Sequence, residues 1–405
     1  MTNKNFVWVP SEWRVWDTAT SLGVDLIPDS FIFRKPTDVA PDQYNQEPFE
    51  KRIGVCSYLD FPNSFMVSDS KTFQKRYNNL NWLDCLIVHC TEHTTHWWPV
   101  IYADLCLAAN TDKIVFVFDG YQDYTNPPSD RFFCNMRSWF HWVAEVNQWQ
   151  EISTRTHPHR RYMFDALIGT ARTGRIPLLY NLLGSDLLEK TLINFQSNPH
   201  YNPWPDIAQQ YPEQFEKWGV LEKYSSPELA EFDHPVITEF KQTNQDKSAH
   251  EQYLANTLTH DGMHTTVGNI IAWDIYANSW YSIVCETCDT GFHNLFLTEK
   301  TAKCLFAKRI FLMSGGGKLL KYLQSFGFKT FHGPYIDESY DNEPNDQKRH
   351  VMVWEQINRL ARYNPTQVYE YYQPVLDHNF EVFQALPKKQ MLELQNFLHN
   401  AIWKT

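Results

Sequence analysis

The sequence predicts an α/β protein of two domains with largely parallel sheets. Short apolar runs typical of buried strands alternate with amphipathic stretches typical of helices. Polar or glycine-rich turns follow several of these runs, as they do where parallel strands end. The chain has 405 residues, which suits two domains better than one. We expect an N-terminal domain over 1–155, a C-terminal domain over 156–375 and a closing helical segment over 376–405.

The N-terminal domain carries three apolar runs that predict strands. These runs are Ile53–Tyr58, Cys85–Cys90 and Lys113–Phe118, and a helical pattern over about 97–109 separates the last two. Residues 1–50 are rich in proline and tryptophan with weak periodicity, so we expect them to form an irregular cap. Parallel strands carry chemistry at their carboxyl ends. The segments after the second and third runs are therefore the expected functional loops of this domain.

The most informative stretch of the chain begins at Tyr281. Tyr281–Cys285 predicts a buried strand that ends at Glu286, and Thr298 is placed to cap a new helix. Glu299 and Lys300 fall in the first turn of that helix, and Lys303 lies on the same face. A helix N-terminus attracts anions, added lysines suit a diphosphate, and a carboxylate suits a ribose diol. The competing interpretation is an ordinary capped and solvated helix start.

A glycine-rich turn follows the next predicted strand. Arg309–Met313 is the strand, and Ser314–Gly317 is a turn in which Gly316 leaves room for a ligand to approach the backbone. A helix over Leu319–Phe326 and a last short strand over Phe328–Phe331 complete the pattern. The alternative is that the glycines form only a connector.

A second polar turn opens the C-terminal domain. Tyr162–Ile168 predicts a strand, and Arg175–Leu183 predicts an amphipathic helix. Arg172 and Arg175 flank the turn between them. Arginine suits a diphosphate because its planar fork donates two parallel hydrogen bonds and stays charged. Both arginines are otherwise expected to be solvated or paired with acidic neighbours.

Two motifs of this stretch resemble glycosyltransferases. A strand ending in glutamate, a spacer and Phe296-Leu297-Thr298-Glu299-Lys300 resemble the donor-site signature of the α-1,3-fucosyltransferases. The longer string is similar to glycosyltransferases of tailed bacteriophages, through Leu320-Lys321-Tyr322-Leu323, Gly327-Phe328-Lys329-Thr330-Phe331 and Ile336-Asp337-Glu338-Ser339-Tyr340-Asp341. The Gly-x-x-Arg-x-x-Arg of the second turn is similar as well. The resemblance covers roughly 160–185 and 280–380.

The resemblance implies a GT-B fold, in which two Rossmann-like domains face each other across a cleft and a C-terminal helix crosses back. It implies a nucleotide-diphosphate sugar as donor substrate, with no other cofactor and no catalytic metal. Glu286 matches the first glutamate of the signature, Glu299 the ribose-binding glutamate and Lys300 the lysine that faces the diphosphate. Thr287-Cys288 replaces Asn-Ser, which leaves the sugar open.

Sugar transfer that inverts the anomeric centre needs a base for the acceptor hydroxyl. Glu92, His93, Asp119 and Asp123 follow the predicted strands of the N-terminal domain and are the candidates. The spacing of His93 with His89 and His96 is that of a helical metal set, but His89 falls within a predicted strand, which breaks that geometry.

Two classes of acceptor remain open. Phage enzymes of this class can modify hydroxylated or hydroxymethylated bases in viral DNA, which requires base flipping; others modify saccharides or proteins. The phage resemblance and an aromatic content of 16% favour DNA slightly, whereas a net charge of −11 weakens it. The rival functions are a sugar-nucleotide-binding module without catalysis and a structural phage protein.

Composition and termini place the chain in a broad class. Eight scattered cysteines suit free thiols in a reducing compartment, and Cys285 with Cys288 forms a lone C-x-x-C, for which a redox role is the alternative. No apolar run has the length of a membrane span and the N-terminus has no signal core, which predicts a cytoplasmic protein.

Two further segments complete the expectations. Thr257–Thr266 predicts a loop with two histidines. Met352–Trp403 predicts helix interrupted at Pro365 and again at Pro387. This last segment serves either as the returning helix or as a dimer face, and the oligomeric state is left open.

Overall fold

The computed structural model describes residues 160–197, 202–231, 271–287, 290–292 and 294–403, and elsewhere the short strands given below with residues 140, 143 and 144. The chain divides into two compact units. Unit 1 comprises Met1–Ser138 with Pro387–Thr405, and unit 2 comprises Trp139–Leu386.

Unit 1 contains a six-stranded sheet whose neighbouring strands are all parallel, in the order β2-β1-β3-β4-β5-β7. The predicted second and third strands pair in register, with Cys90 opposite Phe118. The carboxyl ends of these two strands therefore lie at the same edge of the sheet. The strands of this unit are β1 (Asn5–Trp8), β2 (Phe31–Arg34), β3 (Arg52–Ser57), β4 (Cys85–Cys90), β5 (Ile114–Phe118), β6 (Tyr121–Gln122) and β7 (Phe132–Cys134).

The strands predicted in unit 1 from apolar runs are confirmed by β3, β4 and β5. The expectation of an irregular cap over 1–50 is wrong where β1 and β2 join the sheet. Each of these strands has only four residues. So short a run gives too little periodicity to be recognised in a segment rich in proline and tryptophan. The helix expected over about 97–109 lies outside the described residues.

Unit 2 contains a five-stranded sheet in the order β10-β9-β8-β13-β15. The edge strand β10 is antiparallel, and the other neighbours are parallel. The chain leaves β8 toward β9 on one side and leaves β13 toward β15 on the other, so the topological switch point lies between β8 and β13. The strands are β8 (Tyr162–Thr170), β9 (Thr191–Gln196), β10 (Lys223–Ser225), β13 (Ser279–Cys285) and β15 (Ile310–Ser314).

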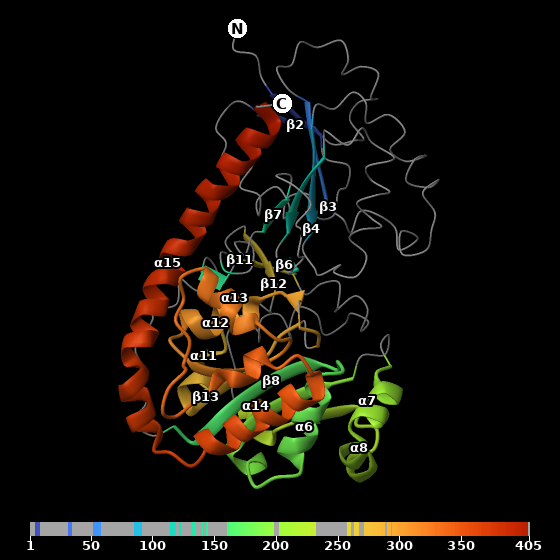
Figure 1. The fold of residues 1–405 in the computed structure, drawn as a ribbon, viewed down its shortest axis with the longest axis vertical. Coiled ribbons are helices and arrows are strands. Elements are labelled where there is room, and N and C mark those ends of the chain that lie inside the picture. Colours follow the sequence, from blue (N-terminus) through green and yellow to red (C-terminus); the bar gives the residue numbers. More distant parts are fainter. Residues whose placement is uncertain are drawn as a thin grey trace. The chain divides into compact units, whose positions relative to one another are not determined.

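Helices cover both faces of this sheet (Figure 1). Since such crossovers are as a rule right-handed, two that leave the switch point in opposite directions are expected to place α6 and α12 on opposite faces. α14 packs against α6 and β15, whereas α11 packs against β8 and β13. The elements are α6 (Arg175–Leu183), α7 (Trp204–Gln210), α8 (Pro212–Trp218), α11 (Trp273–Asn278), α12 (Glu299–Phe306), α13 (Leu319–Ser325), α14 (Asp346–Leu360) and α15 (Pro365–Trp403), with short 3-10 turns η6 (Leu188–Lys190), η7 (Pro227–Glu231) and η9 (Glu338–Asn342).

A buried ion pair lies near the amino ends of the unit 2 strands, at what we call the amino edge. Arg309 Nη2 donates to Asp165 Oδ2 at 2.7 Å, and both side chains are buried. Ser279 and Ser282 donate to the same carboxylate oxygen at 2.7 and 2.9 Å. Arg309 Nη1 donates to the carbonyls of Tyr276 and Ser279 at 2.7 and 2.6 Å. These charged groups are held entirely by other groups of the core.

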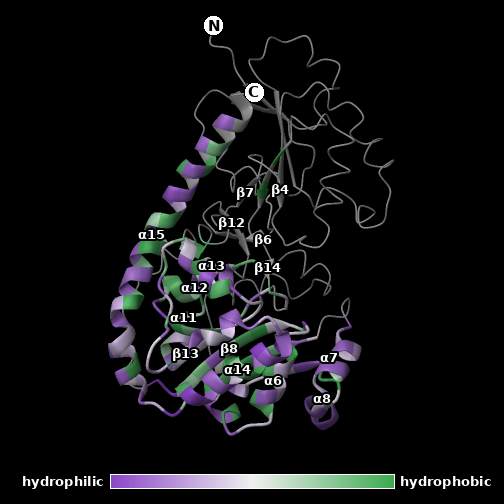
Figure 2. Cartoon of the chain, in the orientation of Figure 1, coloured by the Kyte–Doolittle hydropathy of each residue, from purple (hydrophilic) through white to green (hydrophobic). Residues whose placement is uncertain are grey.

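The C-terminal segment departs from prediction at one of the two prolines that were expected to interrupt it. α14 ends before Pro365, as expected, but α15 continues through Pro387 to Trp403. A proline removes one helical hydrogen bond, and apolar burial on both sides of it offsets that cost. Phe383 and Leu386 are buried before the proline and Leu394 after it. Figure 2 shows hydrophobic and hydrophilic residues alternating along α15.

Two further local predictions are wrong. Phe328–Phe331 is not a strand, because side chains hold its backbone: Asn379 exchanges two hydrogen bonds with Lys329, and Glu338 accepts from the Phe331 amide. Thr257–Thr266 is not a loop but contains the antiparallel strands β11 (Thr257–His260) and β12 (Met263–Thr266). The two residues between these strands are Asp261-Gly262, a hairpin signal that the sequence carries openly.

Within the part of the chain that the structure describes, no helix combines the length and apolarity that crossing a bilayer requires.

Candidate functional site

The carboxyl edge of the unit 2 sheet, where β8, β13 and β15 end, brings several predicted residues together. Glu286 follows β13 and is fully buried. Its carboxylate accepts hydrogen bonds from the Thr298 amide at 3.0 Å, the Thr298 hydroxyl at 2.7 Å and the Thr301 hydroxyl. The Thr287 amide adds a fourth at 3.2 Å. This carboxylate therefore fixes the first turn of α12 to the end of β13.

Thr298 is the N-cap of α12, as predicted. Its side chain accepts from the Lys300 amide at 3.4 Å, and the residue is only 1% exposed. The cap satisfies one of the helix-terminal N–H groups. Because Glu286 holds Thr298 in turn, the N-terminus of α12 is fixed from two directions.

The first two turns of α12 present one carboxylate and two ammonium groups. Lys300 Nζ donates to Glu299 Oε1 at 2.6 Å and to Thr298 Oγ1 at 3.3 Å. The side chains of Glu299 and Lys300 are 14% and 24% exposed, so the pair is partly open to solvent. Lys303 is half-buried one turn farther along the helix. The carboxylate predicted for ribose thus lies directly beside the lysine predicted for the diphosphate.

The charges of this turn influence one another. Burial disfavours charge on Glu299, but the ammonium groups of Lys300 and Lys303 outweigh it and hold the pKa of this carboxyl below its ordinary value. Burial lowers the pKa of Lys303 to about 8, with Glu299 opposing this shift and Lys300 adding to it. The turn therefore gains or loses a positive charge close to neutral pH.

The two predicted arginines have different environments. Arg172 follows β8, is partly exposed, and donates from Nη1 to the Thr287 carbonyl at 3.0 Å. Arg175 is 3% exposed and donates to carbonyls at two strand ends: Nε and Nη2 reach Glu286 at 3.3 and 2.9 Å, and Nη1 reaches Ile168 at 3.0 Å. Arg175 thus joins the ends of β8 and β13, while the partly exposed Arg172 lies at the same junction.

The glycine-rich turn after β15 is engaged mainly with other parts of the chain. The Gly317 amide donates to the Gly291 carbonyl at 2.9 Å, and a Cβ at Gly317 would lie 2.4 Å from the Phe292 ring. The amides of Leu320 and Lys321, at the start of α13, donate to the Asp341 carboxylate at 3.0 and 3.1 Å. A ligand anion at the N-terminus of α13 would have to displace this carboxylate. Gly316 lies buried in the turn, and its donor-binding role stays a prediction.

The first turn of α14 holds the loops of the carboxyl edge. Asp346 accepts from the Gly291 amide with both oxygens, at 2.9 and 3.0 Å, and pairs with Arg349. Arg349 is 1% exposed and donates from Nε to the Gly315 carbonyl at 3.0 Å. One ion pair therefore anchors the segment after β13 and the turn after β15.

Sequence analysis did not identify four residues that shape this edge: Thr301, Asp341, Asp346 and Arg349. Asp341 lies in a string quoted for its resemblance, with no role given to it. Asp346 and Arg349 have the i,i+3 spacing of a helical ion pair, which was a usable signal. Their contacts to Gly291 and Gly315 join segments too distant in sequence for spacing to reveal.

The candidate bases Glu92, His93, Asp119 and Asp123 lie outside the described residues, as do His96 and Cys288. His89 lies within β4. Cys285 and Cys304 are buried, and neither is part of a disulfide. Among the residues that the structure describes, no three His, Cys, Asp or Glu side chains gather as ligands for a metal ion.

Comparisons with known proteins give one distant likeness. No protein-family model and no curated protein sequence matches the chain. The crystal structure of a glycosyltransferase from Rickettsia africae ESF-5 aligns over 99% of this chain and 100% of its own, with 11% identity and a TM-score of 0.37. A TM-score and an identity of this size do not establish a common fold.

Proposed function

We propose that the protein is a glycosyltransferase that moves a sugar from a nucleotide-diphosphate sugar to a hydroxyl group. The observation that carries the proposal is the placement of partly exposed Arg172 at the switch point between β8 and β13, together with the Glu299–Lys300 pair on the fixed first turn of α12. Ligands of open α/β sheets bind at such switch points. The motif resemblance to glycosyltransferases supports the same conclusion.

Each polar group of the site has a role in this proposal. Arg172, Lys300 and Lys303 bind the diphosphate, and Glu299 accepts hydrogen bonds from the ribose hydroxyls. The acceptor oxygen bonds to the anomeric carbon while the bond from that carbon to the diphosphate breaks, and the electron pair stays on the diphosphate. Fixed cations favour this step because negative charge develops on the leaving group.

Glu286 and Arg175 take positioning roles in this proposal. The Glu286 carboxylate accepts three hydrogen bonds from Thr298 and Thr301 at the start of α12 and one from the Thr287 amide. Arg175 is buried against strand-end carbonyls. These two residues would hold the donor-binding groups in place. From the sequence we expected Arg175 to contact the diphosphate and Glu286 to contact sugar or ribose hydroxyls.

The proposal assigns donor binding to the C-terminal domain, 156–375, in a GT-B arrangement, and the acceptor to the N-terminal domain. The acceptor proton passes to a base there, with Glu92, His93 and Asp119 as the candidates. Two acceptor classes remain: a hydroxymethylated base in DNA, and a saccharide or protein hydroxyl. The assay below carries an arm for each.

The test measures release of nucleoside diphosphate from UDP-, GDP-, CDP- and ADP-sugars, with hydroxymethylated DNA, unmodified DNA, saccharides or no acceptor. We expect release from one donor, accelerated by one acceptor class, and reduced at least tenfold in Lys300→Ala. Lys190→Ala is the matched control, because Lys190 lies just before β9, with a side chain that is 56% exposed. Donor binding with no release under any condition would indicate a binding module and contradict the proposal.

A further inference from the structure

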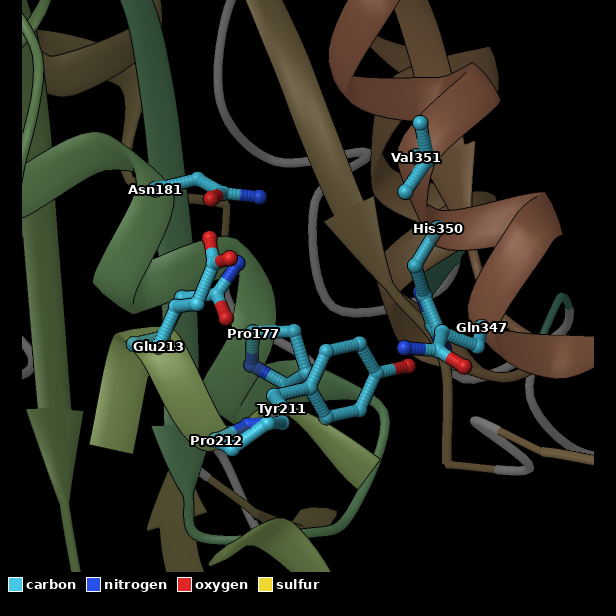
Figure 3. Close-up of a pocket in the computed structure, with 9 residues that line it drawn as sticks. Pro177, Asn181, Tyr211, Pro212, Glu213, Gln347, His350 and Val351 are labelled. Carbon is cyan, nitrogen blue, oxygen red and sulfur yellow. The ribbon is translucent and has the colours of Figure 1, made fainter. Parts of the chain in front are cut away.

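A separate pocket lies in unit 2 between α6, the junction of α7 with α8, and the first turns of α14 (Figure 3). Its volume is about 260 Å³. None of the residues proposed to contact the donor lines it. Its place on the α6 and α14 face of the sheet makes it distinct from the first turn of α12.

The polar groups of the pocket are mostly neutral. Three side-chain amides line it, from Asn181, Gln214 and Gln347, each able to donate and to accept. Glu213 adds one carboxylate, and neither lysine nor arginine is among the lining residues. A phosphate or nucleotide would meet this carboxylate without a compensating cation, so the lining disfavours anions.

The pocket also offers apolar surface. Pro177 and Pro212 present their rings, and Tyr211 lies edge-on to His350 with ring centroids 6.3 Å apart. In Figure 3 the side chains of Tyr211, Gln347 and His350 gather at one end of the pocket. Aromatic and proline rings beside amide and carboxylate groups suit a ligand with C–H faces and hydroxyl edges.

His350 contributes a neutral imidazole to this end. It is 6% exposed, and its buried Nε2 has no hydrogen-bond partner among the residues that the structure describes. Burial lowers the pKa of His350 to about 4, and the nearby Arg349 acts in the same direction while Asp346 opposes it. The imidazole is therefore uncharged at neutral pH and adds no attraction for an anion.

We propose that this pocket binds one sugar unit of a neutral saccharide. Its volume of about 260 Å³ lies just below the range of about 300–1,000 Å³ that is usual for drug-sized ligands, which leaves room for a molecule of monosaccharide size. Hydroxyl groups match the amides and Glu213, and the rings match a sugar's C–H faces. This site goes beyond the proposed function, because it would hold a sugar without a nucleotide.

The test is ligand-observed NMR on the full chain, by saturation transfer, with a panel of neutral monosaccharides and disaccharides. Val351 lines the pocket on α14 and is 49% exposed, so Val351→Trp can fill the pocket from the surface. Val220 is 52% exposed and does not line the pocket, which makes Val220→Trp the matched control. Asn181→Leu, which removes one amide at nearly constant volume, is a second variant.

We expect at least one neutral sugar to receive saturation from the wild type and from Val220→Trp. Its affinity should fall at least tenfold in Val351→Trp and by a smaller factor in Asn181→Leu. Titration of UDP, GDP, CDP and ADP into the same proteins separates this site from the donor site. The proposal would be overturned if no sugar received saturation from the protein, or if Val351→Trp gave the same saturation transfer as the wild type. Loss of nucleotide binding in Val351→Trp would also overturn it, because the pocket would then belong to the donor site.

Discussion

The two edges of the unit 2 sheet use similar residue types in opposite ways. At the amino edge, the Asp165 and Arg309 side chains are 4% and 2% exposed, and serines and carbonyls hold both. At the carboxyl edge, Glu299 and Lys300 also form an ion pair, but their side chains are 14% and 24% exposed. Arg172 beside them is partly exposed as well.

The difference separates charges that stabilise the fold from charges that can bind a ligand. A buried ion pair whose hydrogen-bonding groups are all satisfied inside the core has no group available for a ligand. Removal of one of its side chains leaves the other charge buried without a partner. A partly exposed pair contributes less to folding than a buried one and can rearrange toward an anion. We therefore expect substitutions at the amino edge to change stability and substitutions at the carboxyl edge to change nucleotide affinity.

The largest effect is expected for Asp165→Ala. The substitution leaves the buried Arg309 guanidinium without its carboxylate, which costs about 3–5 kcal/mol. Urea unfolding followed by circular dichroism measures the loss in free energy of unfolding. Asp186→Ala is the control, since Asp186 is 86% exposed in a surface pair and should change stability by less than about 0.5 kcal/mol. A similar loss in free energy of unfolding in the two variants would show that the ion pair at the amino edge does not stabilise the fold.

The next effect is expected for Arg172→Ala, in affinity rather than stability. Hydrogen bonds to charged groups contribute about 1.5–3 kcal/mol, so nucleoside diphosphate should bind about 10- to 150-fold more weakly. The free energy of unfolding should stay within about 0.5 kcal/mol of the wild type, because Arg172 is partly exposed. Titration calorimetry and urea unfolding measure the two quantities. Unchanged affinity would remove Arg172 from the donor site.

Glu286→Gln should affect both quantities, because Glu286 is a buried residue at the carboxyl edge. The new amide group faces donors at Thr298 and Thr301, and unmatched donors cost about 1–3 kcal/mol. The start of α12 should loosen, so nucleotide affinity should fall along with stability. A fall in stability with unchanged nucleotide affinity would show that the Glu286 carboxylate does not position the donor site.

Sequence patterns predicted the structural features that depend on neighbouring residues and missed the contacts between residues distant in the sequence. The start of α12 at Thr298 and the bounds of α6 follow from local capping and periodicity, and both are confirmed. Glu286 was singled out, but its four donors lie up to 15 residues away, and no local pattern shows that its carboxylate is engaged.

The glycine-rich turn illustrates the same limit. Its sequence favours close approach by a ligand, whereas in the structure Phe292 packs against Gly317 and Asp341 caps α13. Each is a tertiary contact. The candidate bases of the N-terminal domain remain predictions.

The smallest effect is expected when the pH is raised, and it concerns nucleotide affinity. Lys303, with a pKa of about 8, is charged below that pH and neutral above it, so its attraction for a diphosphate is present near pH 7 and lost by about pH 9. A solvent-accessible ion pair is worth about 0.2–1 kcal/mol, which corresponds to a roughly 1.4- to fivefold weaker affinity at the higher pH. Calorimetric titration at both values measures it. Lys303→Met should bind nucleoside diphosphate weakly, with the same affinity at both pH values. If the pH dependence of affinity persists in this variant, another group causes it.

The most direct test of the contrast between the two edges is a thermal-shift titration with UDP, GDP, CDP and ADP on wild type, Lys300→Ala and Lys190→Ala. One nucleotide at about a hundred times its dissociation constant should stabilise the wild type and Lys190→Ala by about 2.7 kcal/mol and raise their melting temperatures. Lys300→Ala should unfold at nearly the same temperature without ligand and show little or no shift with it. No shift with any nucleotide, or an equal shift in Lys300→Ala, would contradict a nucleotide site at the carboxyl edge.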